Sequence, residues 1–182
     1  MRIIAGKRKG LNIKTIEGES TRPTRDMVRE ALFSILTSKI PDAKFLDLFA
    51  GSGAIGIEAI SRGAVEACFS DTNSQCIKVI KENINKANFE NESRVFNLDY
   101  KLVLKKLKDE KFDVIFIDPP YNKGLGVDAI TKISEYDLLA DDGVIILETD
   151  TNEEVPEGIG IYEKYNSKKY GRNILNLFKR KG

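Results

Sequence analysis

Four consecutive residues, Asp118-Pro119-Pro120-Tyr121, have the composition of a site for a flat ligand that donates hydrogen bonds. They follow the apolar run 114–117, which predicts a buried strand, and ligands of open α/β sheets bind beyond the carboxyl ends of strands. Two successive prolines fix φ twice and lack N–H donors, so this loop presents carbonyl oxygens. A carboxylate before them and a ring after them favour a planar base with an exocyclic amino group. An ordinary turn at a strand end is the alternative.

A glycine-rich segment joins the first predicted strand to its helix. Gly51, Gly53 and Gly56 satisfy G-x-G-x-x-G, and Asp71 follows roughly twenty residues on, so a nicotinamide or flavin enzyme is a competing prediction. Asp47 argues against a dinucleotide, because a carboxylate at this place repels a pyrophosphate from the helix N-terminus. The same carboxylate suits a ligand with a positive end, such as the ammonium group of S-adenosylmethionine.

A third acid, Asp99, follows the next strand, where it could accept a hydrogen bond from an adenine amino group between Leu98 and Tyr100. A single aspartate at a strand end often only caps the following helix. Acids at three successive strand ends, with the proline loop on a fourth, favour a binding site at one edge of the sheet. The residues predicted to contact the cofactor are Asp47, Phe49, Ala50, Gly51, Ser52, Gly53, Asp71, Asp99 and Tyr100.

Strands and helices alternate from residue 45 onward, which is typical of a parallel α/β sheet. Periodicity predicts strands at 45–49, 67–70, 94–98, 112–117 and 143–148, helices at 54–62, 74–86, 101–108 and 127–136, and a final antiparallel pair at 159–165 and 170–179. The predicted fold class is α/β, with a doubly wound, mostly parallel, seven-stranded Rossmann-like sheet. We expect a single domain over residues 1–182, made of a basic hairpin extension (1–20), a basic helix (21–40) and a catalytic core (41–182).

Basic side chains concentrate at both ends of the chain, although the formal net charge is only +1. Residues 1–30 hold eight basic and four acidic side chains, and residues 163–182 hold seven basic and one acidic. Basic ends around an acidic middle favour a polyanion lying across one face. The residues predicted to contact the phosphates of this polyanion are Lys7, Arg8, Lys9, Arg22, Arg25, Arg29 and Arg172. Simple solubility is the alternative.

The N-terminal residues alternate around two glycines and predict a small hairpin, 2–5 against 11–14, with a basic tip. A helix should follow, with Thr24 as its N-cap. Arg25 and Arg29 share one face of that helix, which is more favourable if an anion lies nearby. An Asp26–Arg29 ion pair is an equally good explanation.

Composition excludes several kinds of chemistry. The chain has no histidine, and Cys68 and Cys76 lack CxxC spacing, so hydrolytic triads and a zinc site are not expected. No apolar stretch approaches the ~20 residues needed to span a bilayer. The N-terminus turns basic too early for a signal peptide. We therefore expect a cytoplasmic protein without metal or membrane partner. A monomer is a separate expectation, which the composition does not establish.

The sequence resembles a known family. Asp47-Leu48-Phe49-Ala50-Gly51-Ser52-Gly53 with Asp118-Pro119-Pro120-Tyr121 is similar to the Rossmann-fold S-adenosylmethionine-dependent methyltransferases of exocyclic amino groups. Arg2-Ile3-Ile4-Ala5-Gly6, Lys9-Gly10, Thr21-Arg22-Pro23-Thr24 and Val28-Arg29-Glu30-Ala31-Leu32-Phe33 resemble the bacterial small-subunit ribosomal RNA guanine-N2 methyltransferases within that group. The resemblance extends to Tyr170-Gly171. Arg25 and Met27 depart from it, since the family tends to carry a small hydroxyl and a basic residue there.

The resemblance implies methyl transfer to the N2 amino group of a guanine in 16S rRNA of the small ribosomal subunit. It places Asp47, Gly51, Gly53, Asp71 and Asp99 at the cofactor, and Asp118, Pro119, Pro120 and Tyr121 at the reacting base. Three alternatives remain open. One is an adenine-N6 or cytosine-N4 methyltransferase acting on DNA or another RNA. The others are a nicotinamide oxidoreductase and a non-catalytic RNA-binding module.

Overall fold

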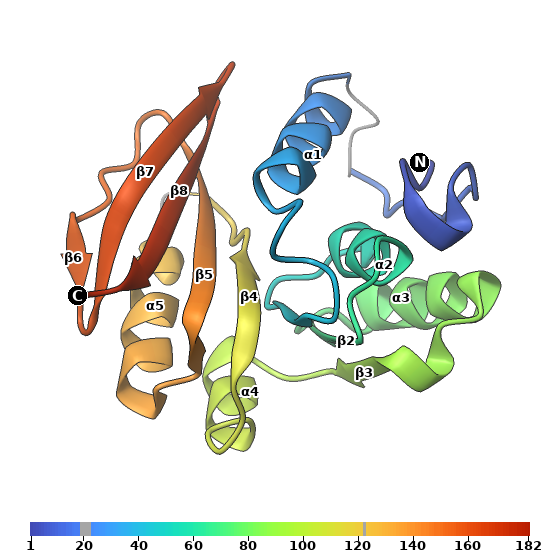
Figure 1. The fold of residues 1–182 in the computed structure, drawn as a ribbon. Helices are drawn as coiled ribbons and strands as arrows, with labels where there is room; N and C mark the ends of the chain where they lie inside the picture. The colour runs from blue at the N-terminus through green and yellow to red at the C-terminus, as the bar shows by residue number, and fades with distance from the viewer. Residues whose placement is uncertain (19–22, 122) are drawn as a thin grey trace.

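The computed structural model describes residues 1–18, 23–121 and 123–182, with the backbone alone at residues 23 and 24 (Figure 1). Its strands are β1 (Lys44–Asp47), β2 (Glu66–Ser70), β3 (Ser93–Phe96), β4 (Phe112–Ile117), β5 (Leu139–Asp150), β6 (Gly158–Ile159), β7 (Tyr162–Tyr170) and β8 (Asn173–Arg180). Its helices are α1 (Pro23–Ile35), α2 (Ala54–Ser61), α3 (Ser74–Ala87), α4 (Tyr100–Lys106) and α5 (Leu125–Tyr136), with short 3₁₀ turns η1 (Gly6–Arg8) and η2 (Glu90–Glu92). In these described ranges, no helix is long and apolar enough to cross a membrane.

One sheet in the order β3-β2-β1-β4-β5-β8-β7-β6 organises the fold. Strands β1 to β5 pair in parallel, and β8, β7 and β6 continue the sheet with antiparallel pairing. The predicted doubly wound α/β fold is confirmed. The predicted number of seven strands is wrong, because the two-residue strand β6 pairs with β7 and makes the sheet eight-stranded. A strand of two residues has too little alternation to be recognised in a sequence.

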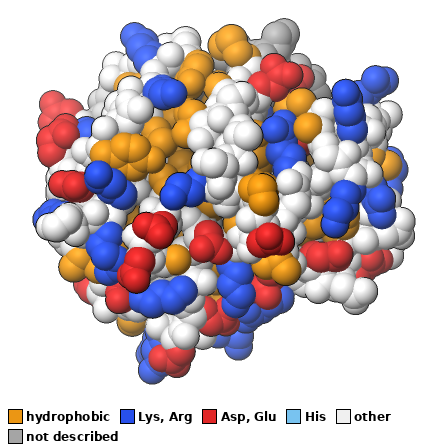
Figure 2. Space-filling model, in the orientation of Figure 1, with side chains coloured by type: hydrophobic (Ala, Val, Ile, Leu, Met, Phe, Trp, Pro, Cys, Tyr) orange, Lys and Arg blue, Asp and Glu red, His pale blue; other side chains and the backbone are white. Residues whose placement is uncertain are grey.

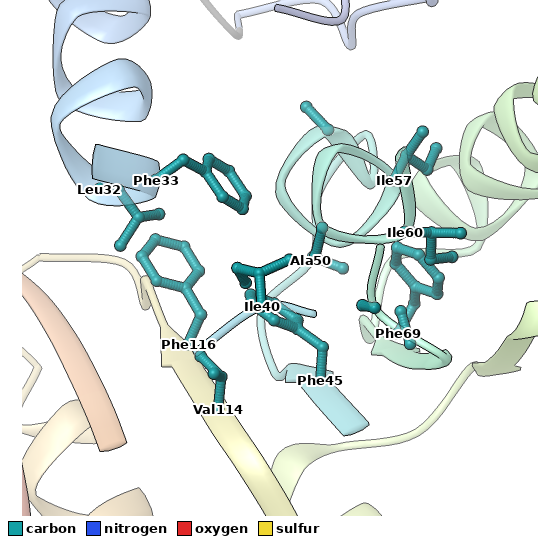
Figure 3. Close-up of a cluster of buried hydrophobic side chains, with 14 of the residues drawn as sticks. Leu32, Phe33, Ile40, Phe45, Ala50, Ile57, Ile60, Phe69, Val114 and Phe116 are labelled. Atoms are coloured by element: carbon teal, nitrogen blue, oxygen red, sulfur yellow. The ribbon is translucent and has the colours of Figure 1, made fainter. Parts of the chain in front are cut away.

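Alternate residues of the central strands face opposite layers of the fold. On β4, Phe116 packs in the apolar cluster that includes α1, α2 and α3, whereas its neighbour Ile115 packs with α4 and α5. Figure 3 shows Leu32 and Phe33 of α1 pointing into the first of these layers, where Phe116 also lies. Because the central strands are buried on both faces, polar groups that bind ligands are best placed at the strand ends.

The N-terminal segment is docked on α2. Within residues 1–18, the predicted hairpin is reduced to a single antiparallel bridge, Arg2 with Asn12, and its tip forms η1. Glu58 of α2 is fully buried and accepts hydrogen bonds from the backbone N–H groups of Ile4 and Ala5, at 2.9 and 3.0 Å. A side chain therefore satisfies backbone donors that a longer hairpin would have paired.

Helix α1 begins at Pro23, so the prediction of Thr24 as its N-cap is wrong and Thr24 lies inside the helix. Proline suits the first helical position because its φ is already close to the helical value and its missing N–H is not needed there.

Gly6 and Gly10 provide a matched test of the close approach between this segment and α2. Both have left-handed φ values, +82° and +84°, but a Cβ on Gly6 would lie 1.8 Å from the Ser61 carbonyl oxygen, whereas one on Gly10 would meet nothing within 4 Å. We expect Gly10→Ala to lower the free energy of unfolding by ~1 kcal/mol, from its φ alone. Gly6→Ala should cost ~2–3 kcal/mol, because the segment must also lift from the helix. Urea denaturation measures both, and equal losses would contradict the docked arrangement.

Candidate active site

Five successive strands of the sheet each carry a carboxylate at or near the carboxyl end. In the order β3-β2-β1-β4-β5, these are Asp99, Asp71, Asp47, Asp118 and Glu148. The first four were predicted from the sequence, and the structure brings them to one edge of the sheet. Glu148 was missed. Among the described residues, no group of three His, Cys, Asp or Glu side chains is arranged to hold a metal ion.

A cavity of about 430 Å³ opens over the ends of β1, β2 and β3. Asp71 is fixed in it, because its two carboxylate oxygens accept from the N–H groups of Gly51 and Asn73 at 3.0 and 2.9 Å. Each oxygen has a second acceptor position, which a ribose hydroxyl could use. The cavity is lined by Arg25, Leu48, Phe49, Gly51, Asp71, Thr72, Leu98, Asp99, Tyr100, Asp118, Pro119, Pro120, Tyr121 and Leu125.

One end of this cavity combines a carboxylate with apolar walls. Asp99 caps α4 by accepting from the Lys101 N–H at 2.9 Å. The Tyr100 ring lies 5.4 Å from that of Phe49, and its hydroxyl donates to Asp128. Burial, and then the bond to Asp128, raise the pKa of Tyr100 and keep it neutral. A flat aromatic ligand with an amino group fits these surroundings.

The Asp47 carboxylate caps the N-terminus of α2. Its side chain is buried, and Oδ2 accepts from the Gly56 N–H at 3.1 Å, in the first turn of the helix. Gly53 does not line either cavity; its left-handed φ of +81° turns the chain into the helix. Because a carboxylate already holds a backbone donor at this helix N-terminus, a pyrophosphate would meet repulsion there, as the sequence predicted.

A smaller cavity, about 110 Å³, lies between α1 and the sheet. It is lined by Met1, Arg25, Val28, Arg29, Leu32, Asp47, Phe49, Ala50, Ser52, Ala54, Ile55, Phe116, Asp118, Tyr121 and Glu148. The two cavities share Arg25, Phe49, Asp118 and Tyr121. Two ligands placed in them would therefore meet beside Asp118 and Tyr121.

Tyr121 and Glu148 are joined through Asn173 of β8. Asn173 Nδ2 donates to Glu148 Oε1 and to the Tyr121 hydroxyl, the latter at 3.3 Å. Burial raises the pKa of Tyr121 to about 12, with Asp118 and Glu148 adding to the effect, so its hydroxyl stays neutral at physiological pH. Burial also raises the pKa of Glu148, while Asn173 and Arg25 oppose this. The sequence held one signal for Glu148, an apolar run that ends in an acid, as the run before Asp118 does.

The residues predicted to contact RNA differ in their exposure. Lys7, Lys9, Arg25 and Arg172 are exposed, and Figure 2 shows Lys and Arg side chains gathered at the right-hand edge, over the N-terminal segment. Arg8 is half-buried, where its Nε donates to the Ala87 carbonyl at 2.6 Å and its guanidinium lies over the Phe89 ring. Arg22 lies outside the described residues.

Arg29 is not an exposed phosphate contact, so we withdraw it from the predicted set. Only 5% of its side chain is exposed, and Nη2 donates to the Arg2 carbonyl at 2.7 Å and lies 3.4 Å from Asp26. The alternative Asp26–Arg29 pair is therefore present. The i,i+4 spacing of Arg25 and Arg29 places both on one face of α1. The spacing does not show that the N-terminal segment covers Arg29.

The chain is similar in sequence and fold to several known proteins. A family model described as "Conserved hypothetical protein 95" matches residues 1–179. The Bacillus subtilis (strain 168) protein YlbH is 35% identical over 184 residues, with 100% of each chain covered. Ribosomal RNA small subunit methyltransferase D of Escherichia coli (strain K12) is 32% identical over 180 residues, covering 99% of this chain and 90% of that protein. A solved structure of the Thermus thermophilus hypothetical protein TTHA0928 superposes with a TM-score of 0.82 at 31% identity, covering 98% and 99% of the two chains. The chain therefore belongs to the Conserved hypothetical protein 95 family, with ribosomal RNA small subunit methyltransferase D proteins among its relatives.

Proposed function

We propose that this protein transfers a methyl group from S-adenosylmethionine to the exocyclic N2 amino group of a guanine in 16S rRNA. The observation that carries the proposal is the meeting of two cavities at Asp118 and Tyr121. One has the groups that suit an adenosyl moiety, and the other is bordered by acceptors and a ring that suit a base. Relatives named ribosomal RNA small subunit methyltransferase D support methylation of small-subunit ribosomal RNA, without specifying the base or the atom.

The row of carboxylates gives the cofactor a direction along the sheet. Asp99 would accept from the adenine amino group, Asp71 from the ribose hydroxyls, and Asp47, which lines the smaller cavity, would face the ammonium group. Asp118 is next in the row, on β4. This order leaves the methyl group beside the loop 118–121.

Orientation is the main contribution of the protein to catalysis. S-adenosylmethionine supplies an electrophilic methyl group and its own leaving group. The amino group of guanine is a poor nucleophile, because its lone pair is delocalised into the ring. Asp118 Oδ and the Pro119 carbonyl would accept both of its hydrogens, which favours a tetrahedral nitrogen with its lone pair toward the methyl group. Holding two reactants in such a geometry can contribute ~7–11 kcal/mol. Asp118 then accepts the proton that leaves the nitrogen.

Tyr121 should stack on the reacting base. Its side chain is 43% exposed at the junction of the cavities, and stacking of a base on an aromatic ring contributes ~1–3 kcal/mol. We expect Tyr121→Ala to raise KM for RNA by roughly 5- to 150-fold, the equivalent of that energy, whereas Tyr121→Phe keeps the ring and should stay within a few-fold of wild type. Steady-state kinetics on small subunits measure both. A similar loss in the two variants would assign the role to the hydroxyl and its bond to Asn173.

Lys7 and Lys9 should contact the RNA backbone. Both are exposed at the basic edge formed by the N-terminal segment. Each phosphate contact contributes about 0.7–0.9 to the slope of log K against log salt. The double variant Lys7→Ala/Lys9→Ala should therefore bind RNA more weakly and reduce that slope by about 1.5. Lys108→Ala is the control, since Lys108 is exposed beyond α4. An unchanged slope of log K against log salt would show that these lysines do not contact phosphates and serve only solubility.

The function itself is tested by product analysis. Small ribosomal subunits from a strain that lacks the counterpart enzyme are incubated with the protein and methyl-labelled S-adenosylmethionine, then digested to nucleosides. We expect the label in N2-methylguanosine. Label in N6-methyladenosine or N4-methylcytidine would establish the alternative amino methyltransferase. Absence of label, with protection against heating by NAD and not by S-adenosylmethionine, would favour an oxidoreductase.

A further inference from the structure

The fifth carboxylate of the row, Glu148, takes no part in methyl transfer as described above. It follows Leu147, which pairs with Ile117, so Glu148 and Asp118 lie side by side on neighbouring parallel strands. Such strands are about 4.8 Å apart. Both side chains line the smaller cavity with Tyr121. Since β4 lies between β1 and β5, Glu148 is on the side of Asp118 away from Asp47, where the cofactor ammonium would bind.

Glu148 is a buried carboxylate with one oxygen already in use. Its side chain is 8% exposed, and Asn173 Nδ2 donates to Oε1. Among the described residues, Oε2 accepts no hydrogen bond, and the Glu148 residue lines the smaller cavity. A buried carboxylate is unfavourable unless donors surround it, so a ligand that brings a donor to Oε2 would fit this place best.

We infer that Glu148 selects guanine by accepting a hydrogen bond from its N1–H, next to the N2 amino group that Asp118 holds. This inference rests on the proposed function. In guanine, N1–H and the N2 amino group are neighbouring donors on one edge. In adenine and cytosine, the ring nitrogen beside the amino group is an acceptor, which would face the Glu148 carboxylate without a proton between them. The loop 118–121 can hold any of these amino groups, so the choice among bases falls to Glu148.

The test changes the hydrogen-bonding edge of the target base. Small subunits are reconstituted with 16S RNA that carries, at the mapped target position, either guanine or 2,6-diaminopurine. The analogue keeps the 2-amino group, has an acceptor at N1, and carries an amino group in place of the C6 carbonyl. We expect the wild-type protein to methylate the analogue with kcat/KM about 10- to 100-fold below that for guanine, because two acceptors then face each other.

Glu148→Gln should weaken or reverse this preference. The Oε1 atom keeps its bond from Asn173, so the new amide nitrogen faces the cavity and donates. Its kcat/KM for guanine should fall about 10- to 100-fold, whereas that for the analogue should stay within about 3-fold or rise. Glu163→Gln is the matched control, since Glu163 lies on β7 with 44% of its side chain exposed, and should keep the wild-type preference.

Three results would overturn the inference. Equal wild-type rates on guanine and the analogue would do so without any variant. Equal losses on both substrates in Glu148→Gln would assign Glu148 a structural role. Weaker binding of S-adenosylmethionine by Glu148→Gln would assign it to the cofactor. Failure of the proposed function is distinct, because the wild-type protein would then place no label on N2 of guanine in natural subunits.

Discussion

Asp118→Ala is expected to slow methyl transfer by about 10³-fold or more, the effect of removing a group that orients and stabilises the reacting atoms. Asp118 borders both cavities, so it can hold the amino group where the base and the methyl donor meet. The acids that we propose for the adenosyl group, Asp71 and Asp99, follow other strands and remain in place. The affinity for S-adenosylmethionine, measured by calorimetry, should therefore change only a few-fold. Single-turnover rates on small subunits measure the loss.

The matched control is Asp141→Ala. Asp141 lies on β5 with 98% of its side chain exposed, away from both cavities, and its removal should leave the rate unchanged. A large loss of cofactor affinity in Asp118→Ala, with a normal rate at saturating cofactor, would show that Asp118 binds the cofactor and not the reacting base.

Glu58→Ala is expected to lower the free energy of unfolding by ~3–5 kcal/mol, the cost of leaving partners of a buried charge unpaired. Glu58 is fully buried, accepts from the N–H groups of Ile4 and Ala5, and bonds to Arg62 Nε at 2.9 Å. Without it, two backbone donors and a guanidinium lose their acceptor. Amide hydrogen exchange at Ile4 and Ala5 should accelerate together with the loss measured by urea denaturation.

Glu82→Ala is the control for Glu58→Ala. Glu82 also links the N-terminal segment to a helix, through Lys14. Unlike Glu58 it is open to solvent, with 37% of its side chain exposed and 65% of that of Lys14, so we expect a change below ~1 kcal/mol. A loss of under ~1 kcal/mol in Glu58→Ala as well would show that the segment does not depend on this buried carboxylate.

The central elements of the fold could be predicted because each has a strong local pattern. The predicted strand at 112–117 coincides with β4, and the predicted helix at 74–86 differs from α3 by one residue. The N-terminal segment was predicted less well, because its partner is a side chain far along the chain. Glu58 did leave a signal, as a single charge within the apolar helix α2.

The candidate site could be predicted in part for a related reason. Parallel strands bring their carboxyl ends to one edge, so Asp47, Asp71, Asp99 and Asp118 could be grouped without knowing any contact. Glu148 depends on the register of β5 with β4, and its partner Asn173 on the register of β8. Register is a tertiary property that the sequence pattern does not contain.

We propose that the cofactor extends along the acids that follow β3, β2 and β1 and leaves the end of the smaller cavity near Glu148 to the base. A crystal structure with S-adenosylhomocysteine would show which residues hold the cofactor. We predict the ribose hydroxyls on Asp71, the ammonium group toward Asp47, and the sulfur facing Asp118. An ammonium group bound to Glu148, or a ribose away from Asp71, would contradict the account.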